Sequence, residues 1–546
     1  MAVFDFARAL ACAAALVGMA QAAGAEALAV GTPAQGSLAP GQVVRWPVQA
    51  PAGQVVQGDF DAPDAMLDVI GAEGRHLRRL VGAGGGPQGF TWQVQPGEQL
   101  QVRAGPQPQG SAYTLNLRRA LALAPAAPAS AESPLPSPRL RALARTLAEG
   151  GSTAAFWQER AQHGTPLVEP LSERESLVTF LWRGTHATQS VRLFGSPSGN
   201  HDPLQQLPGS DLWWASFRMP LGARLSYRLA PDVPQVQGSA QDNRRMILAT
   251  AQRDPLNARA FPARADAALD AFQGASVLEL PAAPPQPWVA PRPSVAQGTI
   301  TRHEIASRIL GNQRPVWLYR PAGAPPQALL VVFDAHAYRE DVPTPRIVDN
   351  LMADGLIPPT AVLMVSNPSA QARATELPPN PLFARFLDEE LMPWVQTQGL
   401  GQPPEATVIA GSSFGGLASA YAGLMLPQRF GRVLSLSGSY WWAPQGELPG
   451  WMMRAYAAAP SQDVRFYLDA GRYEGARGGQ SGILETNRHL GDVLRAKGYA
   501  VTHREHATGH DYLHWQGALG CGLVALLNPA RFAQDLPVCD ASAPPT

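Results

Sequence analysis

The sequence predicts a mostly parallel β-sheet with helices on both faces, preceded by two β-rich regions of sandwich character. Three observations indicate this. Apolar strand-like runs alternate with helical runs from residue 298 onward, which is the order of a parallel sheet. Short alternating runs separated by Gly/Pro turns fill most of the chain before residue 260. A Pro-rich connector at residues 261–297 divides the two parts.

The chain has 546 residues, enough for two to four domains with sizeable cores. Lys and Arg together number 43, as do Asp and Glu, so the net charge is zero and nucleic-acid binding has no support. Lys497 is the only lysine. Any anion is therefore bound through guanidinium groups, which are planar and permanently charged.

The first 25 residues read as a signal peptide. Arg8 precedes an apolar run at residues 9–18, and small residues follow. That run is too short to span a bilayer, and no other segment is apolar enough, so we expect no membrane span. Export would remove Cys12 and would allow Cys521 and Cys539 to form a disulfide.

Residues 26–120 are predicted to form an accessory β-domain, with alternating runs such as 43–48 and 113–117. Their overall pattern resembles the pre-peptidase C-terminal β-sandwich modules, which implies an accessory or binding role. Residues 121–139 are an Ala/Pro/Ser linker. Residues 140–260 form a second β-domain, which opens with a helix at 140–149.

Residues 298–535 are predicted to form the catalytic domain. Strands are expected at 328–333, 361–365, 407–409, 433–436, 464–468 and 501–505, and helices at 346–354, 383–398, 417–425 and 484–497.

The sequence Gly411-Ser-Ser-Phe-Gly415 fits G-x-S-x-G between a predicted strand and helix. In an α/β hydrolase this turn lifts a serine hydroxyl above the sheet, because the flanking glycines permit a strained backbone. Ser413 is therefore the candidate nucleophile, and the Phe414 N–H is a candidate oxyanion donor. Ser412 does not have glycines two residues before and two residues after it.

A serine hydroxyl needs a neighbouring base, which in this fold follows the last strand, after the acid. His510 has that position. The acid should follow the preceding strand, where Glu474 and Asp469 both qualify. Related hydrolases place the acid three residues after the glycine, which favours Glu474; a Ser–His dyad without a strong orienting acid is the alternative. The second oxyanion donor is expected on the loop after residues 328–333, and we select the His336 N–H.

Several strings resemble the enterochelin (enterobactin) esterase family. Gly164-Thr-Pro-Leu-Val-Glu-Pro170, Ser196-Pro-Ser-Gly-Asn-His201 and Thr250-Ala-Gln-Arg-Asp-Pro-Leu-Asn257 resemble its N-terminal domain. Ala410-Gly-Ser-Ser-Phe-Gly-Gly-Leu417, Leu436-Ser-Gly-Ser-Tyr-Trp-Trp442 and Gly509-His-Asp-Tyr-Leu-His-Trp515 resemble its carboxyl domain. The resemblance covers roughly residues 156–527.

The resemblance implies a serine esterase that hydrolyses the trilactone of catecholate siderophores such as enterobactin or salmochelin, ferric or iron-free. It implies Ser413 as the nucleophile and His510 as the base. The signal-like segment and the accessory domain depart from the usual cytoplasmic members and suggest a periplasmic variant. The alternatives are a general aryl or feruloyl esterase and an inactive siderophore-binding protein.

A ferric tris-catecholate is a trianion with flat aromatic faces, so arginine and aromatic side chains would suit its pocket. The substrate-binding candidates on loops near Ser413 are Arg373, Tyr440, Trp441, Trp442, Arg472, Arg477 and Trp515. We expect no cofactor and no metal ligands in the protein, with Fe(III) present only inside the substrate.

Overall fold

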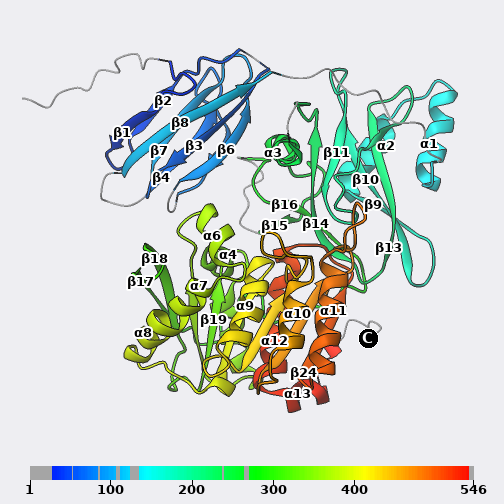
Figure 1. The fold of residues 1–546 in the computed structure, drawn as a ribbon. Coiled ribbons are helices and arrows are strands. Elements are labelled where there is room, and N and C mark those ends of the chain that lie inside the picture. Colours follow the sequence, from blue (N-terminus) through cyan, green and yellow to red (C-terminus); the bar gives the residue numbers. More distant parts are fainter. Residues whose placement is uncertain are drawn as a thin grey trace, which may run out of the picture.

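A computed structural model describes residues 27–51, 53–83, 87–105, 111–122, 135–236, 239–262, 270–535 and 537–539. The expected signal peptide and most of the expected linker lie outside these residues. Three bodies follow one another along the chain: a β-sandwich, a mixed β-domain with three helices, and a large α/β domain (Figure 1).

The first body consists of two four-stranded antiparallel sheets that share one core. The first sheet, in spatial order, contains β1 (Ala34–Leu38), β8 (Ser111–Leu121), β3 (Val55–Asp61) and β6 (Gln88–Gln93). The second contains β2 (Val43–Trp46), β7 (Gln99–Ala104), β4 (Ala65–Ile70) and β5 (His76–Val81). Phe60 and Leu115 of one sheet pack with Leu67 and Val102 of the other, as expected of alternating strands in a sandwich.

The second body begins with α1 (Pro138–Ala148) and α2 (Ala154–His163) and carries α3 (Ala240–Thr250) near its end. One sheet has the order β12 (Gln205–Gln206), β13 (Leu212–Pro220), β10 (Glu175–Arg183) and β9 (Leu167–Pro170). The other has the order β11 (Val191–Gly195), β14 (Arg224–Pro231), β16 (Ala275–Glu279) and β15 (Ala260–Phe261).

The third body is built on an eight-stranded sheet. Its order is β17 (Thr299–Ser307), β18 (Asn312–Arg320), β20 (Thr360–Val365), β19 (Ala328–Phe333), β21 (Thr407–Ser412), β22 (Arg432–Leu436), β23 (Arg465–Gly471) and β24 (Ala500–His506). The strands from β20 to β24 are parallel, whereas β17 and β18 form an antiparallel hairpin at one edge. The α/β fold class predicted from the sequence is confirmed.

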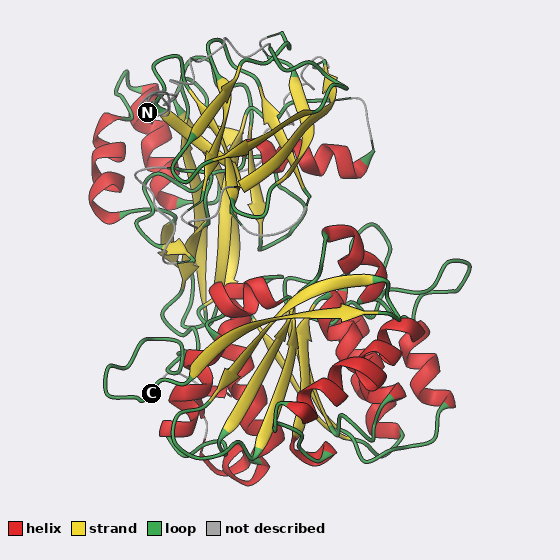
Figure 2. Ribbon diagram, turned by 90° about the vertical axis from the view of Figure 1, so that its left-hand side faces the viewer, coloured by secondary structure: helices red, strands yellow, loops and turns green. Residues whose placement is uncertain are grey.

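Helices cover both faces of this sheet (Figure 2). In β19, Leu329 and Val331 point into the core on one face, and Leu330 and Val332 into the core on the other. Burial on both faces explains why the parallel strands are continuous apolar runs. The helices are α4 (Ala335–Glu340), α5 (Thr344–Ala353), α6 (Ala370–Glu376), α7 (Pro381–Arg385), α8 (Met392–Thr397), α9 (Phe414–Met425), α10 (Trp451–Ala458), α11 (Ile483–Ala496), α12 (Tyr512–Leu527) and α13 (Pro529–Asp535).

Two local features differ from the sequence prediction. The hairpin β17–β18 was not among the expected strands. The helix expected at residues 383–398 is divided into α7, a π-helical turn at Phe386–Leu391 and α8. Short helical turns also occur at Pro404–Ala406 and Pro537–Cys539. No helix in the described part of the chain is long and apolar enough to cross a bilayer.

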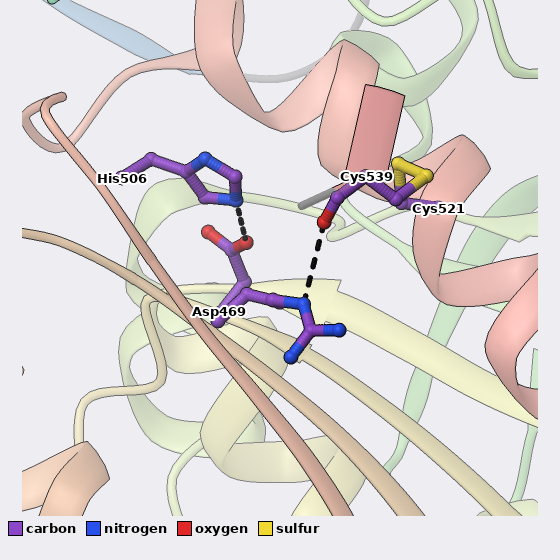
Figure 3. Close-up of a disulfide and its surroundings, with 5 residues drawn as sticks. Asp469, His506, Cys521 and Cys539 are labelled. Carbon is purple, nitrogen blue, oxygen red and sulfur yellow. Dashed lines mark hydrogen bonds and ion pairs between the residues drawn. A yellow bond between two sulfur atoms is a disulfide. The ribbon is translucent and has the colours of Figure 1, made fainter. Parts of the chain in front are cut away.

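The described residues contain the Cys521–Cys539 disulfide, which joins α12 to the turn at Pro537–Cys539 (Figure 3). Nε of Arg504 on β24 donates to the carbonyl oxygen of Cys539 at 3.3 Å. The carboxyl-terminal turn is therefore bound covalently to α12 and by a hydrogen bond to the last strand.

The bodies pack directly on one another. Arg119 of the first body pairs with Asp242 of the second, and Val55 shares a buried cluster with Met246. Between the second and third bodies, the Ser226 N–H donates to Oδ2 of Asp511 at 2.6 Å. The loop that follows β24 is thus held against β14.

Candidate active site

Ser413 stands at the junction of β21 and α9 with φ 58° and ψ −119°. A positive φ is strained for a serine, and such strain is typical of a nucleophile turn. The flanking glycines allow the close packing that the turn requires: a Cβ atom on Gly411 would lie 2.6 Å from the carbonyl carbon of Gly415. Ser412 is fully buried at the end of β21, so Ser413 presents the accessible hydroxyl.

The Ser413 turn is bonded to the loop after β22. The Ser413 N–H donates to the Leu436 carbonyl at 2.9 Å, and the Ser439 N–H donates to the Ser413 carbonyl at 3.2 Å. The hydroxyl oxygens of Ser413 and Ser439 lie 3.3 Å apart. The loop after β22 also contacts Glu474, through the Ser437 hydroxyl.

The structure brings His510 and Glu474 together. Nδ1 of His510 lies 2.6 Å from Oε1 of Glu474, whose side chain is buried. The second carboxylate oxygen accepts from the Ser437 hydroxyl at 2.7 Å and from the Gly471 N–H at 2.6 Å. These contacts fix the carboxylate and favour a proton on Nδ1, which leaves Nε2 as the basic nitrogen.

Asp469, the other candidate acid, contacts two different histidines. Its Oδ1 lies 2.7 Å from Nε2 of His514. Its Oδ2 lies 3.1 Å from Nε2 of His506 (Figure 3). Burial would raise the pKa of Asp469, but the two imidazoles outweigh it and hold that pKa well below its usual range. Burial lowers the pKa of His506. Asp469 therefore supports the strand end rather than the base.

Asp469, His506 and His514 also form the one group of described residues that could geometrically hold a metal ion, with ligand atoms within 4.8 Å of one another. Both imidazoles already contact the carboxylate directly. The three residues form a buried hydrogen-bonded network, and the expectation of no metal ligands stays a prediction.

The expected oxyanion donors belong to two neighbouring helix starts. Phe414 is the first residue of α9, and His336 is the second residue of α4. A Cβ atom on Gly415 would lie 3.5 Å from Oδ2 of Asp334, the residue before α4, so the two helix starts lie close together. The N–H groups of a first helical turn have no partner within the helix, so the two helix starts could supply oxyanion donors.

Arg373 supports the α4 start. Its Nε and Nη2 donate to the two carboxylate oxygens of Asp334 at 2.7 and 2.8 Å, and Asn367 donates to the same carboxylate at 2.6 Å. The guanidinium also lies 5.8 Å from the centre of the Phe414 ring. Arg373 therefore lies beside Phe414, and its two guanidinium hydrogen bonds are made to Asp334 within the protein.

Two of the predicted substrate contacts lie in the core instead. Tyr440 is fully buried, and its hydroxyl donates to the Ser435 hydroxyl at 2.7 Å. Trp515 is 2% exposed; its ring packs edge-on against His510 with centroids 4.8 Å apart, and its Nε1 donates to the Ser437 hydroxyl at 3.0 Å. Trp515 therefore packs directly against the candidate base. For both residues the prediction of a substrate contact was wrong, because helix α12 and the loop after β22 turn these rings inward.

The other candidates are accessible to different degrees. Trp441 is 44% exposed, with its ring 6.1 Å from that of Phe414. Trp442 is partly buried and packs against Trp451. Arg472 and Arg477 are exposed, and Arg477 donates to the carbonyls of Gly199 and Tyr473 at 3.2 and 3.1 Å.

Ser437 and Ser439 were missed as functional candidates. Ser437 has φ 48° and joins Trp515 to Glu474 through its hydroxyl, while Ser439 faces Ser413. The signal was present in Leu436-Ser-Gly-Ser439, a Ser/Gly turn directly after a strand that borders the nucleophile strand.

Comparison with known proteins gives consistent matches. The family described as enterochelin esterase, N-terminal, matches residues 177–289, and the esterase family matches residues 307–526. The iron(III) enterobactin esterase of Dickeya dadantii (strain 3937) is 31% identical over 424 residues, which cover 68% of this chain and 92% of that protein. The iron(III) enterobactin esterase of Escherichia coli (strain K12) is 30% identical over 404 residues, covering 69% and 96%.

Solved structures agree. The enterobactin esterase from Shigella flexneri, crystallised in the presence of enterobactin, is 28% identical with a TM-score of 0.56, covering 69% of this chain and 98% of that one. The ferric enterobactin esterase from Salmonella typhimurium is 27% identical with a TM-score of 0.57, covering 69% and 99%.

Proposed function

This chain belongs to the enterochelin esterase family, and from that premise we propose that it hydrolyses the ester bonds of catecholate siderophore trilactones of the enterobactin type. The proposal makes it a carboxylic ester hydrolase that serves iron acquisition. The observation that carries it is the contact of Glu474 with His510, together with the Ser437 hydrogen bond to Glu474 from the loop whose Ser439 faces the Ser413 hydroxyl. These three residues supply the acid, the base and the nucleophile of a serine esterase.

In the proposed reaction, Oγ of Ser413 attacks an ester carbonyl of the trilactone while Nε2 of His510 accepts the hydroxyl proton. Glu474 stabilises the imidazolium that forms. The oxyanion of the tetrahedral intermediate accepts hydrogen bonds from the N–H groups of Phe414 and His336. The intermediate collapses as the ester C–O bond breaks, and His510 returns the proton to the leaving alkoxide.

The acyl-enzyme is then hydrolysed by the same groups. A water molecule loses a proton to His510 and attacks the acyl carbon. Collapse of the second tetrahedral intermediate breaks the bond to Oγ of Ser413, His510 returns the proton to that oxygen, and a linear acid is released. Each cycle therefore consumes one water for one ester bond, and Fe(III), where present, enters and leaves with the substrate.

The accessible candidates Trp441, Arg472 and Arg477, with Trp442 behind them, are proposed to contact the substrate. Arg373 is proposed to act mainly by holding the α4 start through Asp334. We also propose a periplasmic location. It is supported by the signal-like first 25 residues and by the Cys521–Cys539 disulfide, which suits an oxidising compartment.

The test is chromatography of the products from ferric and iron-free enterobactin, with wild type beside Ser413→Ala and with ethyl ferulate as a second substrate. We expect linear and monomeric 2,3-dihydroxybenzoyl-serine products from wild type, and loss of nearly all of them in the variant. Faster turnover of ethyl ferulate than of either siderophore would favour a general aryl esterase. Siderophore binding without products would favour an inactive binding protein.

A further inference from the structure

The sheet β11–β14 of the second body presents one face to the loop that carries His510. Ser226 on β14 donates its N–H to Asp511, the residue after His510, at 2.6 Å. On the other side of His510, a Cβ atom on Gly509 would lie 1.6 Å from Oγ of Ser196, which follows β11. Figure 1 shows β14 and β16 directly above the catalytic domain. This part of the second body therefore lies against the loop that carries His510.

An aromatic stack lies on the same face. Phe194 of β11 is opposite Arg228 of β14 in the strand register. The Phe194 ring stacks on the His201 imidazole with centroids 4.8 Å apart and 12° between the planes. The Arg244 guanidinium, from α3, lies 5.6 Å from the centre of the Phe194 ring. Flat rings and guanidinium groups are thus held together by three separate elements.

The positive charge of this face is not balanced by ion pairs. Among the residues that the structure describes, no carboxylate forms an ion pair with Arg192, Arg228 or Arg244. Arg192 donates to the His201 carbonyl at 3.1 Å. Burial lowers the pKa of Arg228 although the nearby charge of Asp511 raises it, and burial followed by Arg244, Arg477 and Arg192 lowers the pKa of His201 although Asp202 raises it. Arg192 and Arg228 are partly buried, whereas Arg244 is exposed. Partly buried cations without a directly paired anion are uncommon in proteins.

We propose that Arg192, Phe194, His201, Arg228 and Arg244, here called the β11–β14 platform, bind one catecholate arm of the siderophore. The inference rests on the proposed function and extends it, because it assigns substrate selection to the second body. A catecholate bound to iron offers a flat ring to Phe194 and His201 and oxyanions to the guanidinium groups. The platform therefore favours the ferric trianion over neutral aryl esters.

Binding is tested directly by quenching of tryptophan fluorescence in the Ser413→Ala protein, which separates affinity from turnover. Arg228→Met removes the charge while keeping an unbranched apolar side chain, and Phe194→Leu removes the ring while keeping apolar bulk. The matched control is Arg183→Ala, which removes an exposed arginine of the same body that pairs with Asp211. The ligands are ferric enterobactin and iron-free enterobactin.

We expect Arg228→Met to weaken ferric enterobactin binding about tenfold or more, as loss of a charged hydrogen bond predicts. Phe194→Leu should weaken it several-fold, Arg228→Lys should restore part of the affinity, and Arg183→Ala should have the wild-type Kd. Iron-free enterobactin, with less negative charge, should respond less. The same substitutions in the active protein should raise KM for ferric enterobactin, and circular dichroism with urea unfolding checks that each variant is folded.

An unchanged Kd for ferric enterobactin in both Arg228→Met and Phe194→Leu would overturn the platform. Wild-type turnover of enterobactin would then still support the proposed function. If wild type binds the siderophore through the platform but forms no product, the esterase proposal fails and the platform stands.

Discussion

Replacing Glu474 by Gln should abolish most of the activity because of the hydrogen bonds around that carboxylate. One oxygen of Glu474 accepts from both the Ser437 hydroxyl and the Gly471 N–H. In the Gln variant, only the amide oxygen can accept these two hydrogen bonds. The amide NH2 must then face Nδ1 of His510, which forces Nδ1 to accept and moves the imidazole proton to Nε2.

An imidazole with a proton on Nε2 cannot accept the proton of Ser413. The wrong tautomer in a serine triad costs about 10⁴-fold in kcat, equivalent to about 5 kcal/mol of transition-state stabilisation. Asp469→Asn offers the matched comparison, since Asp469 contacts His506 and His514 and not His510. It should cost about 3–5 kcal/mol of folding stability but change kcat of the folded enzyme by less than about tenfold.

The assay is steady-state hydrolysis of enterobactin together with urea unfolding of each variant. The reasoning is refuted if Glu474→Gln keeps kcat within about tenfold of wild type, while folded Asp469→Asn loses about a thousandfold or more. That pattern would make Asp469 the functional acid despite its distance from the base.

Three further predictions follow from the same contacts. Ser437→Ala removes the hydroxyl that joins Trp515 to Glu474. It should lower kcat about 10- to 100-fold and leave Kd for the siderophore unchanged. Steady-state kinetics measure the first effect and a binding titration measures the second. The folded-state pKa values of Asp469 and His506 are both lowered, so the unfolded chain binds more protons as the pH falls. The free energy of unfolding should therefore decrease below about pH 6.5, and more steeply below about pH 4. Urea midpoints across this range measure the decrease, and in Asp469→Asn it should be smaller below about pH 4. Reducing the Cys521–Cys539 disulfide, with a sequence separation of 18, should cost about 3 kcal/mol, seen as a lower Tm, and an unchanged Tm would contradict this account.

The α/β core could be predicted because its strands and the G-x-S-x-G turn carry strong local signals. Parallel strands buried on both faces are continuous apolar runs, and the Ser413 turn needs glycines at fixed positions. Position along the chain also identified His510 and Glu474 as neighbours. These features depend on residues close together in sequence or on a fixed strand order.

Side-chain direction could not be predicted in the same way. Tyr440 and Trp515 belong to loop or helix starts that border Ser413, yet their rings point into the core. The linking role of Ser437 and the opposition of Phe194 and Arg228 arise from contacts between segments distant in sequence. Only the packed structure fixes which side of a loop a ring occupies.

The central claim is that the Ser413 hydroxyl forms the covalent intermediate with His510 as its base. The most direct measurement is peptide mapping by mass spectrometry after wild-type enzyme and enterobactin are mixed and quenched within a turnover. The account predicts a siderophore-derived acyl group on the peptide that contains Ser413, located on that residue and absent from His510→Ala. An adduct on Ser412 or Ser439, or full turnover by Ser413→Ala, would contradict it.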